Sequence, residues 1–292
     1  MGIDELLTLG RPGFTLLAFL WGACVGSFLN VCIYRIPRRL SVVAPRSFCP
    51  GCRKPIAWYD NVPMVSWLLL RARCRRCGAP ISPRYAVVEC LTALLFVLAW
   101  LAYGPESGGR VLGLAPVLDP ALVLVHWVAI GGLLLGAFVD CRHLIIPDRV
   151  SLGGIAAGLL SSLLVPALHG AASPAVALVK AAGGAAFGFG LLWLIAQVGR
   201  LLFRKEAMGF GDVKLMGAMG AFFGMAGVLF VLFVASLLGA VFGLFFIATG
   251  RRKLGRHIPF GPYLVTAALL WIFWGPRILA VYTGLLMPEA AG

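Results

Sequence analysis

The chain of 292 residues is 61% hydrophobic and only 12% charged, and its mean hydropathy is +0.95. A soluble domain cannot bury that much apolar surface, so composition indicates an integral membrane protein. The net charge of +14 does not indicate a nucleic-acid-binding protein, because the basic residues lie between apolar segments and form no single basic domain.

The apolar segments predict an all-α polytopic membrane protein, because lipid offers no partners to free backbone groups. The first segment, residues 14–33, follows Asp4, Glu5 and a single basic residue, Arg11. A signal peptide begins with a basic region, so we expect a retained first helix. About eight transmembrane helices are predicted in chain order, at 14–34, 84–103, 119–139, 150–168, 175–203, 212–224, 226–249 and 260–286.

A polar insertion at 35–83 separates the first two predicted helices. It contains Cys49-x-x-Cys52 and Cys74-x-x-Cys77, which is the ligand spacing of a closed four-thiolate zinc site. Disulfides or unpaired thiols are the alternatives, and a reducing cytoplasm disfavours disulfides. We therefore predict three regions: a first helix at 1–34, a zinc-binding insertion at 35–83 and a helical bundle at 84–292.

The remaining cysteines lack pair spacing, and we expect them to be small buried apolar residues. These are Cys24, Cys32, Cys90 and Cys141.

Basic residues divide unevenly between the two sides of the predicted bundle. With the N-terminus outside, 21 of the 25 Lys and Arg residues fall on one side, in the insertion with Arg84 at its edge and in the loops at 140–149, 200–214 and 250–258. Positive residues mark the cytoplasmic face. This distribution predicts a bacterial inner-membrane protein with both termini outside.

Glycines recur four residues apart in several predicted helices, and such spacing allows close helix packing in lipid. Gly22, Gly26 and Asn30 likewise share one face of the first helix. The paired glycines are Gly132 and Gly136, Gly184 and Gly188, Gly220 and Gly224, and Gly239 and Gly243.

Two aspartates, Asp140 and Asp212, lie where apolar segments meet the cytoplasmic side. A carboxylate at the membrane edge is costly and needs a partner or a function. Two such groups brought together share a proton, activate a water and protonate a leaving amine. Gly209 and Gly211, which flank Asp212, permit unusual backbone conformations and close approach of a substrate.

Structural roles remain open for each of these acids. Asp212 can instead cap the next helix, and Asp140 can be a helix-end residue paired with Arg142. Asp148, between Pro147 and Arg149, is mainly a capping or loop acid.

Taken in order, a set of motifs resembles the type IV prepilin peptidase family of bifunctional leader peptidases and N-methyltransferases. They are Gly26-Ser-Phe-Leu-Asn-Val-Cys-Ile-Tyr-Arg-Ile-Pro37, Cys49-Pro-Gly-Cys52, Asp60-Asn-Val-Pro63, Ser66-Trp67, Cys74-Arg-Arg-Cys77, Ile81-Ser-Pro-Arg-Tyr85, Val88-Glu89, Asp140 with Ile146-Pro-Asp148, Gly209-Phe-Gly-Asp-Val-Lys-Leu215 and Ile258-Pro-Phe-Gly-Pro-Tyr263. One departure is Ala72-Arg73, where the family usually has Gly-Lys.

The resemblance implies that Asp140 and Asp212 are the catalytic pair, supported by Gly209, Gly211, Lys214 and Asp148. It implies prepilin and pseudopilin substrates with a short basic leader, and methylation of the new N-terminus by S-adenosylmethionine. No residue is assigned to that cofactor, although the insertion is the one cytoplasmic region large enough to form its pocket. One rival interpretation is a proton-coupled transporter that uses both aspartates as relays; it would require carboxylates near the membrane midplane and an internal repeat. A second is a zinc-anchored membrane scaffold without catalysis, which leaves the glycine-flanked Asp212 unexplained.

Overall fold

A computed structural model describes residues 3–104, 121–204, 208–249 and 259–286. The chain divides into two compact units, Met1–Leu101 and Ala102–Gly292. The described residues are mostly helical and contain no strand, only the isolated bridges Phe48–Pro55 and Arg73–Pro80.

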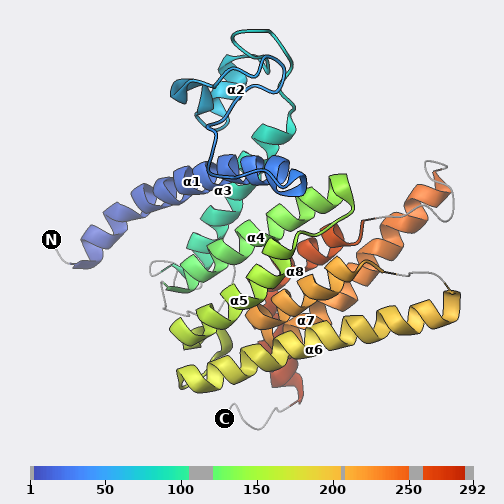
Figure 1. Ribbon diagram of the computed structural model, residues 1–292. Coiled ribbons are helices and arrows are strands. Elements are labelled where there is room, and N and C mark those ends of the chain that lie inside the picture. Colours follow the sequence, from blue (N-terminus) through green and yellow to red (C-terminus); the bar gives the residue numbers. More distant parts are fainter. Residues whose placement is uncertain (1–2, 105–120, 205–207, 250–258, 287–292) are drawn as a thin grey trace. The chain divides into compact units, whose positions relative to one another are not determined.

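Unit 1 contains two long helices, α1 (Ile3–Arg35) and α3 (Arg84–Tyr103), that pack through glycines (Figure 1). A Cβ atom on Gly22 would lie 2.7 Å from the Cα of Ala93, and one on Gly26 would lie 2.7 Å from the Cα of Glu89. On the same face, the amide of Asn30 donates to the carbonyl of Tyr85 at 3.0 Å. The predicted packing face of the first helix is confirmed.

The insertion between these helices contains three short elements, η1 (Ile36–Arg38), η2 (Trp58–Asn61) and α2 (Val65–Leu69). Two buried charged side chains, Arg35 and Glu89, bond to the backbone of the insertion. The guanidinium of Arg35 donates to the carbonyls of Ser41 and Pro45 at 2.9 and 2.8 Å. The carboxylate of Glu89 accepts the backbone N–H of Met64 at 2.7 Å. The start of the insertion is therefore tied to α1 and its middle to α3.

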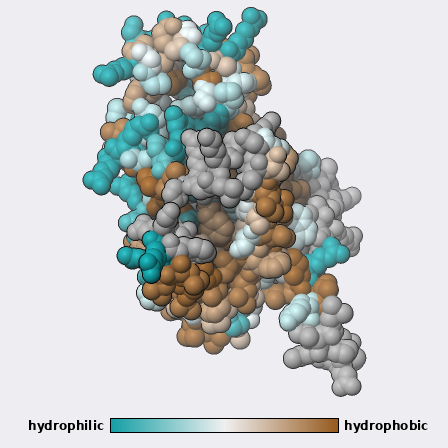
Figure 2. Space-filling model, turned by 90° about the vertical axis from the view of Figure 1, so that its right-hand side faces the viewer, coloured by the Kyte–Doolittle hydropathy of each residue, from teal (hydrophilic) through white to brown (hydrophobic). Residues whose placement is uncertain are grey.

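Unit 2 is a bundle in which α7 is the central helix (Figure 1). It packs against α5, α6 and α8, whereas α4 contacts α8 and α5. Figure 2 shows that much of the visible face of this bundle is hydrophobic, as a surface facing lipid requires. The elements are α4 (Ala121–His143), α5 (Asp148–Leu164), η3 (Pro166–His169), α6 (Pro174–Phe203), α7 (Phe210–Ala248) and α8 (Gly261–Leu286).

Contacts between glycines determine how closely α6 and α7 pack. A Cβ atom on Gly184 would lie 2.2 Å from the carbonyl oxygen of Gly220, and one on Gly220 would lie 2.0 Å from that of Gly184. Not every glycine pair has this role. A Cβ atom on Gly132 would meet nothing within 4 Å, and one on Gly239 would meet only ring atoms at 3.8 Å or more.

The helix α7 is interrupted at Gly224, whose φ of 68° and ψ of −173° are not helical. This position separates the predicted segments 212–224 and 226–249. The break frees a carbonyl near it, and His169 supplies a partner: its Nε2–H donates to Ala221 at 3.1 Å and also contacts the hydroxyl of Ser162 at 3.0 Å. A glycine without a Cβ adopts this positive φ without strain.

Five helical segments of the described chain are long and apolar enough to cross a membrane. They are Pro12–Arg38, Arg84–Tyr103, Ala121–His143, Pro174–Leu202 and Phe210–Phe245. The membrane class is therefore supported, while the total of eight spans stays a prediction. The largest boundary shifts are three: the helix expected at 14–34 begins at Ile3, the one expected at 119–139 continues to His143, and the one expected at 150–168 ends at Leu164.

Candidate active site and metal centre

Asp140 lies in the last turn of α4 and is only 6% exposed. Its Oδ2 accepts the backbone N–H of Gly261 at 3.1 Å. Since Gly261 begins α8, the carboxylate lies at a helix N-terminus, where unpaired N–H groups and the helix dipole favour an anion. The described residues show no ion pair between Asp140 and Arg142, so a helix-end pair does not explain this acid.

Gly261 fits this contact because it has no side chain. A Cβ atom at this position would lie 2.6 Å from Oδ2 of Asp140. Pro262 follows in the first turn of α8, where its missing N–H has no consequence. Sequence analysis did not single out Gly261 as a site residue, although a Gly-Pro pair before an apolar segment is a signal for a helix start.

Asp212 lies in the first turn of α7, two residues after the helix begins at Phe210. Its backbone N–H donates to the carbonyl of Gly209 at 3.1 Å. Its Oδ1 is buried and has no hydrogen-bond partner among the described residues. An unpartnered buried carboxylate oxygen is unfavourable, and no capping bond of its side chain explains it.

The two glycines that flank Asp212 leave room for neighbouring atoms. They do not adopt unusual backbone angles, because neither has a positive φ. A Cβ atom on Gly209 would lie 3.4 Å from Oδ2 of Asp212. One on Gly211 would lie 3.1 Å from the Cβ of Ile146, in the connection between α4 and α5. The expectation of special backbone conformations was wrong, while the close approach of a substrate stays a prediction; Gly211 instead allows Ile146 to pack closely.

The structure brings Asp140 and Asp212 together from α4 and α7, and the charge of Asp140 acts on Asp212. Gly261, the first residue of α8, donates its N–H to Asp140. Ile146, in the connection between α4 and α5, packs against Gly211, the residue before Asp212. A buried acid and a half-buried acid whose charges interact can share a proton and hold a water between them.

Asp148 and Lys214 form an ion pair of 2.7 Å between the N-terminal ends of α5 and α7. The side chain of Asp148 is 64% exposed, unlike Asp140, so its environment is that of a surface acid. The ammonium of Lys214 also lies 5.1 Å from the centre of the Phe210 ring. The pair fastens the helix that carries Asp212, with the small stability that an exposed pair contributes.

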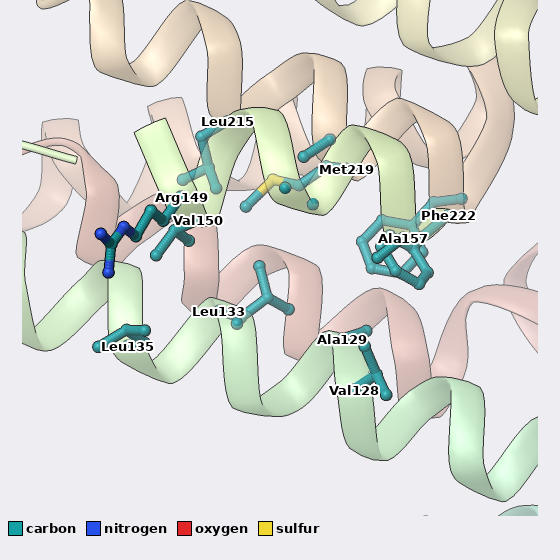
Figure 3. A pocket seen from close by; sticks show the side chains of 15 residues that line it. Val128, Ala129, Leu133, Leu135, Arg149, Val150, Ala157, Leu215, Met219 and Phe222 are labelled. Carbon is teal, nitrogen blue, oxygen red and sulfur yellow. The ribbon is translucent and has the colours of Figure 1, made fainter. Parts of the chain in front are cut away.

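An apolar groove of about 210 Å³ lies between α4, α5 and α7 (Figure 3). Leu133, Met219 and Phe222 are among its lining residues, and the charged side chain of Arg149 lies at one end. Leu215, another lining residue, follows Asp212 by three positions. The groove therefore accommodates apolar groups beside the helix that carries the second carboxylate.

The four cysteines of the insertion form one cluster in unit 1. Their Sγ atoms all lie within 4.8 Å of one another, and those of Cys49 and Cys77 are 3.8 Å apart. A tetrahedron with metal–sulfur bonds of about 2.3 Å has edges of about 3.8 Å. All eight cysteines are free thiols. The donor set and its dimensions therefore fit a zinc ion.

The two halves of this cluster have matching turns. The N–H of Arg53 donates to the carbonyl of Cys49 at 2.8 Å, and that of Gly78 donates to Cys74 at 2.9 Å. Both donors have positive φ, 56° and 69°. Backbone N–H groups of Cys77 and Arg76 lower the pKa of the Cys74 thiol to about 6, whereas burial and the neighbouring thiols raise the pKa of Cys77 to about 11, so one thiol of the cluster ionises well before the other.

The other cysteines lie outside the cluster. Cys32 is buried and Cys90 partly so, but Cys24 and Cys141 are exposed. The expectation that all four are buried was wrong for the latter two, because helix periodicity, not residue type, decides which side faces outward.

Residues 20–103 match the Bacterial Peptidase A24 N-terminal domain, and residues 127–244 match the Type IV leader peptidase family. The chain belongs to the type IV leader peptidase family. The first match contains the cysteine cluster, and the second contains Asp140 and Asp212.

Proteins named prepilin leader peptidase/N-methyltransferase are similar to this chain over most of its length. The one from Aeromonas salmonicida (strain A449) is 35% identical and covers 93% of this chain and 94% of that protein. The one from Neisseria gonorrhoeae is 35% identical, with 88% and 89% covered. The Myxococcus xanthus (strain DK1622) protein is 44% identical, with 82% and 65% covered. No solved structure matches the chain.

Proposed function

We propose that this member of the leader peptidase family is an aspartic endopeptidase that removes the short basic leader from prepilins and pseudopilins, and that it methylates the new N-terminus. The names of its relatives support both activities. The observations that carry the peptidase proposal are that the charge of Asp140 on α4 acts on Asp212 on α7, that Asp140 is buried, and that Asp212 has a buried, unpartnered oxygen.

In this mechanism the two carboxylates hold one proton and a water between them. One carboxylate takes a proton from the water as its oxygen attacks the peptide carbonyl carbon. The other donates its proton to the amide nitrogen as the carbon–nitrogen bond breaks, which yields a carboxyl group and an amine. The N–H of Gly261 fixes the orientation of Asp140 throughout.

The charge distribution supports cleavage at the cytoplasmic face of the inner membrane, with both termini outside. The predicted cytoplasmic segments hold 21 of 25 basic residues, and both aspartates adjoin them. A relay in a transporter would favour carboxylates within interrupted helices near the midplane. Although α7 is interrupted at Gly224, Asp212 lies in its first turn, away from the break, and Asp140 lies in the last turn of α4. Both acids are thus at helix ends, which supports the peptidase.

We expect Asp140→Asn and Asp212→Asn each to lower leader cleavage by roughly 10³- to 10⁴-fold, because the two acids act as a unit. Asp148→Asn removes only an exposed ion pair and should lower the rate by less than about tenfold. Mass measurement of a prepilin incubated with each purified variant is the assay. Retention of substantial cleavage by either of the first two variants would exclude the carboxylate pair.

Gly261→Ala tests the geometry of the pair without removing an acid. The new methyl group would lie 2.6 Å from Oδ2 of Asp140, so the carboxylate must move. A displacement of this order lowers catalysis by about 100-fold. Gly190→Ala is the matched control, since a Cβ atom there meets nothing within 4 Å. Equal cleavage rates for the two variants would show that the Gly261 contact does not position the acid.

The insertion is proposed to hold one structural zinc ion through Cys49, Cys52, Cys74 and Cys77. The ion would complete a closed site of four thiolates and supply folding free energy to a small segment. Elemental analysis of the purified protein should give about one zinc per chain, and the double variant Cys74→Ser/Cys77→Ser should give almost none. Cys24→Ser, outside the cluster, should leave the metal content unchanged. A metal-free protein with four titratable thiols in a folded insertion would refute the site.

Methylation is proposed to depend on unit 1, which contains the insertion, whereas both aspartates belong to unit 2. S-adenosylmethionine supplies the methyl group, and the acceptor amine exists only after cleavage. Asp140→Asn should therefore block methylation of an intact prepilin but not of a supplied mature-length peptide. Mass spectrometry with a labelled methyl donor measures both. Failure of the folded variant to methylate the peptide would mean that the two activities share a site.

A further inference from the structure

The insertion exposes large apolar side chains that its fold does not bury. Trp58 in η2 is 78% exposed, and Val65, Leu68 and Leu69 in α2 are 50%, 66% and 76% exposed. These four residues are called the α2 patch. Soluble domains rarely leave such side chains together in water, so the patch marks a contact surface.

Hydrogen bonds fix the orientation of the patch. Val65, Leu68 and Leu69 are three and four positions apart and share one side of α2. Ser66, on another side, is buried; its hydroxyl donates to the carbonyl of Tyr59 at 3.0 Å and accepts the N–H of Val62 at 3.0 Å. These bonds fasten η2 to α2. The polar side chain therefore points inward, and the apolar side chains point outward.

The surroundings of the patch are strongly basic. Residues 36–83 contain nine Lys and Arg residues and one acid, Asp60, for a net charge of +8. Asp60 is already paired with Arg75 at 2.7 Å. Arg71 and Arg73 follow α2 directly, and both are exposed. Hydrophilic side chains surround apolar ones on this part of the molecule, at the top of the view in Figure 2.

We propose that the α2 patch binds the surface of a bilayer rich in anionic phospholipid. Leucines enter the boundary between headgroups and acyl chains, Trp58 and Tyr59 lie at the level of the headgroups, and the arginines meet phosphate groups. An apolar face with a diffuse basic rim and almost no acid has the charge and hydrophobicity that such an interface complements.

The covalent connections of the insertion favour this partner over a soluble protein. It leaves one apolar segment at Arg38 and enters the next at Arg84, so both of its ends lie at the same membrane face. A tether at each end keeps the patch close to that face, and the resulting effective concentration makes even a weak affinity sufficient. The cysteine cluster is then held beside the bilayer, independently of the proposed peptidase.

A photo-crosslinking experiment on the full chain in nanodiscs tests the proposal. Leu69 is replaced with p-benzoylphenylalanine, and the matched control carries the same group at Lys54, an exposed residue of the first cysteine turn. In phosphatidylglycerol-containing nanodiscs, illumination should attach phospholipid to the peptide around position 69 and much less to that around position 54. Mass spectrometry of the digested protein identifies the adduct.

The charge dependence gives a second measurement. Arg71→Gln and Arg73→Gln should each lower the ratio of lipid-bound to free patch by about fivefold, and pure phosphatidylcholine should lower it further. An adduct to another segment of the same chain would show an internal contact, and an adduct to a second copy would show a dimer; either overturns the proposal. Equal lipid adducts at positions 69 and 54, or none at either, also overturn it.

Discussion

The hydrogen bond from Gly261 to Asp140 joins positions 121 residues apart and is the contact on which the candidate active site depends. It requires the start of α8 to lie against the end of α4 without a side chain between them. Asp212 has to reach the same place from α7. The two carboxylates can therefore act together only if three helix ends meet with little tolerance.

Close packing around α7 supplies that precision. On one side, Gly184 and Gly220 bring α6 and α7 almost to backbone contact. On the other, a Cβ atom on Gly158 of α5 would lie 2.6 Å from the Cβ of Ala221. In lipid the hydrophobic effect does not drive helices together, so van der Waals contact between small residues has a larger share. The small residues that place α7 consequently also place Asp212.

Hydropathy and spacing predicted the membrane class, the cysteine cluster and the two aspartates as candidates. The cluster was predictable because four ligands in two local pairs need no knowledge of distant contacts. The role of Gly261 was not predictable, because it depends on a contact with Asp140 of α4, and no local sequence pattern contains that contact. Glycine spacing identified Gly184 and Gly220, which pack closely, but also Gly132, which has no neighbour within 4 Å of a Cβ atom. The reason is that a period of four residues defines one face of a helix but does not say which element packs against that face.

The insertion is too small and too polar to be stabilised by an apolar core, and its anchors are of other kinds. Arg35 and Glu89 are buried charged groups that bond to its backbone, and the four thiols form the donor set of a metal.

Its net charge of +8 also has a consequence for the proposed substrate. A basic leader is repelled by a basic insertion, so the insertion is poorly suited to bind that leader directly. The same charge attracts the insertion to anionic lipid, which attracts the leader as well. Enzyme and leader would then meet because both concentrate at one anionic surface.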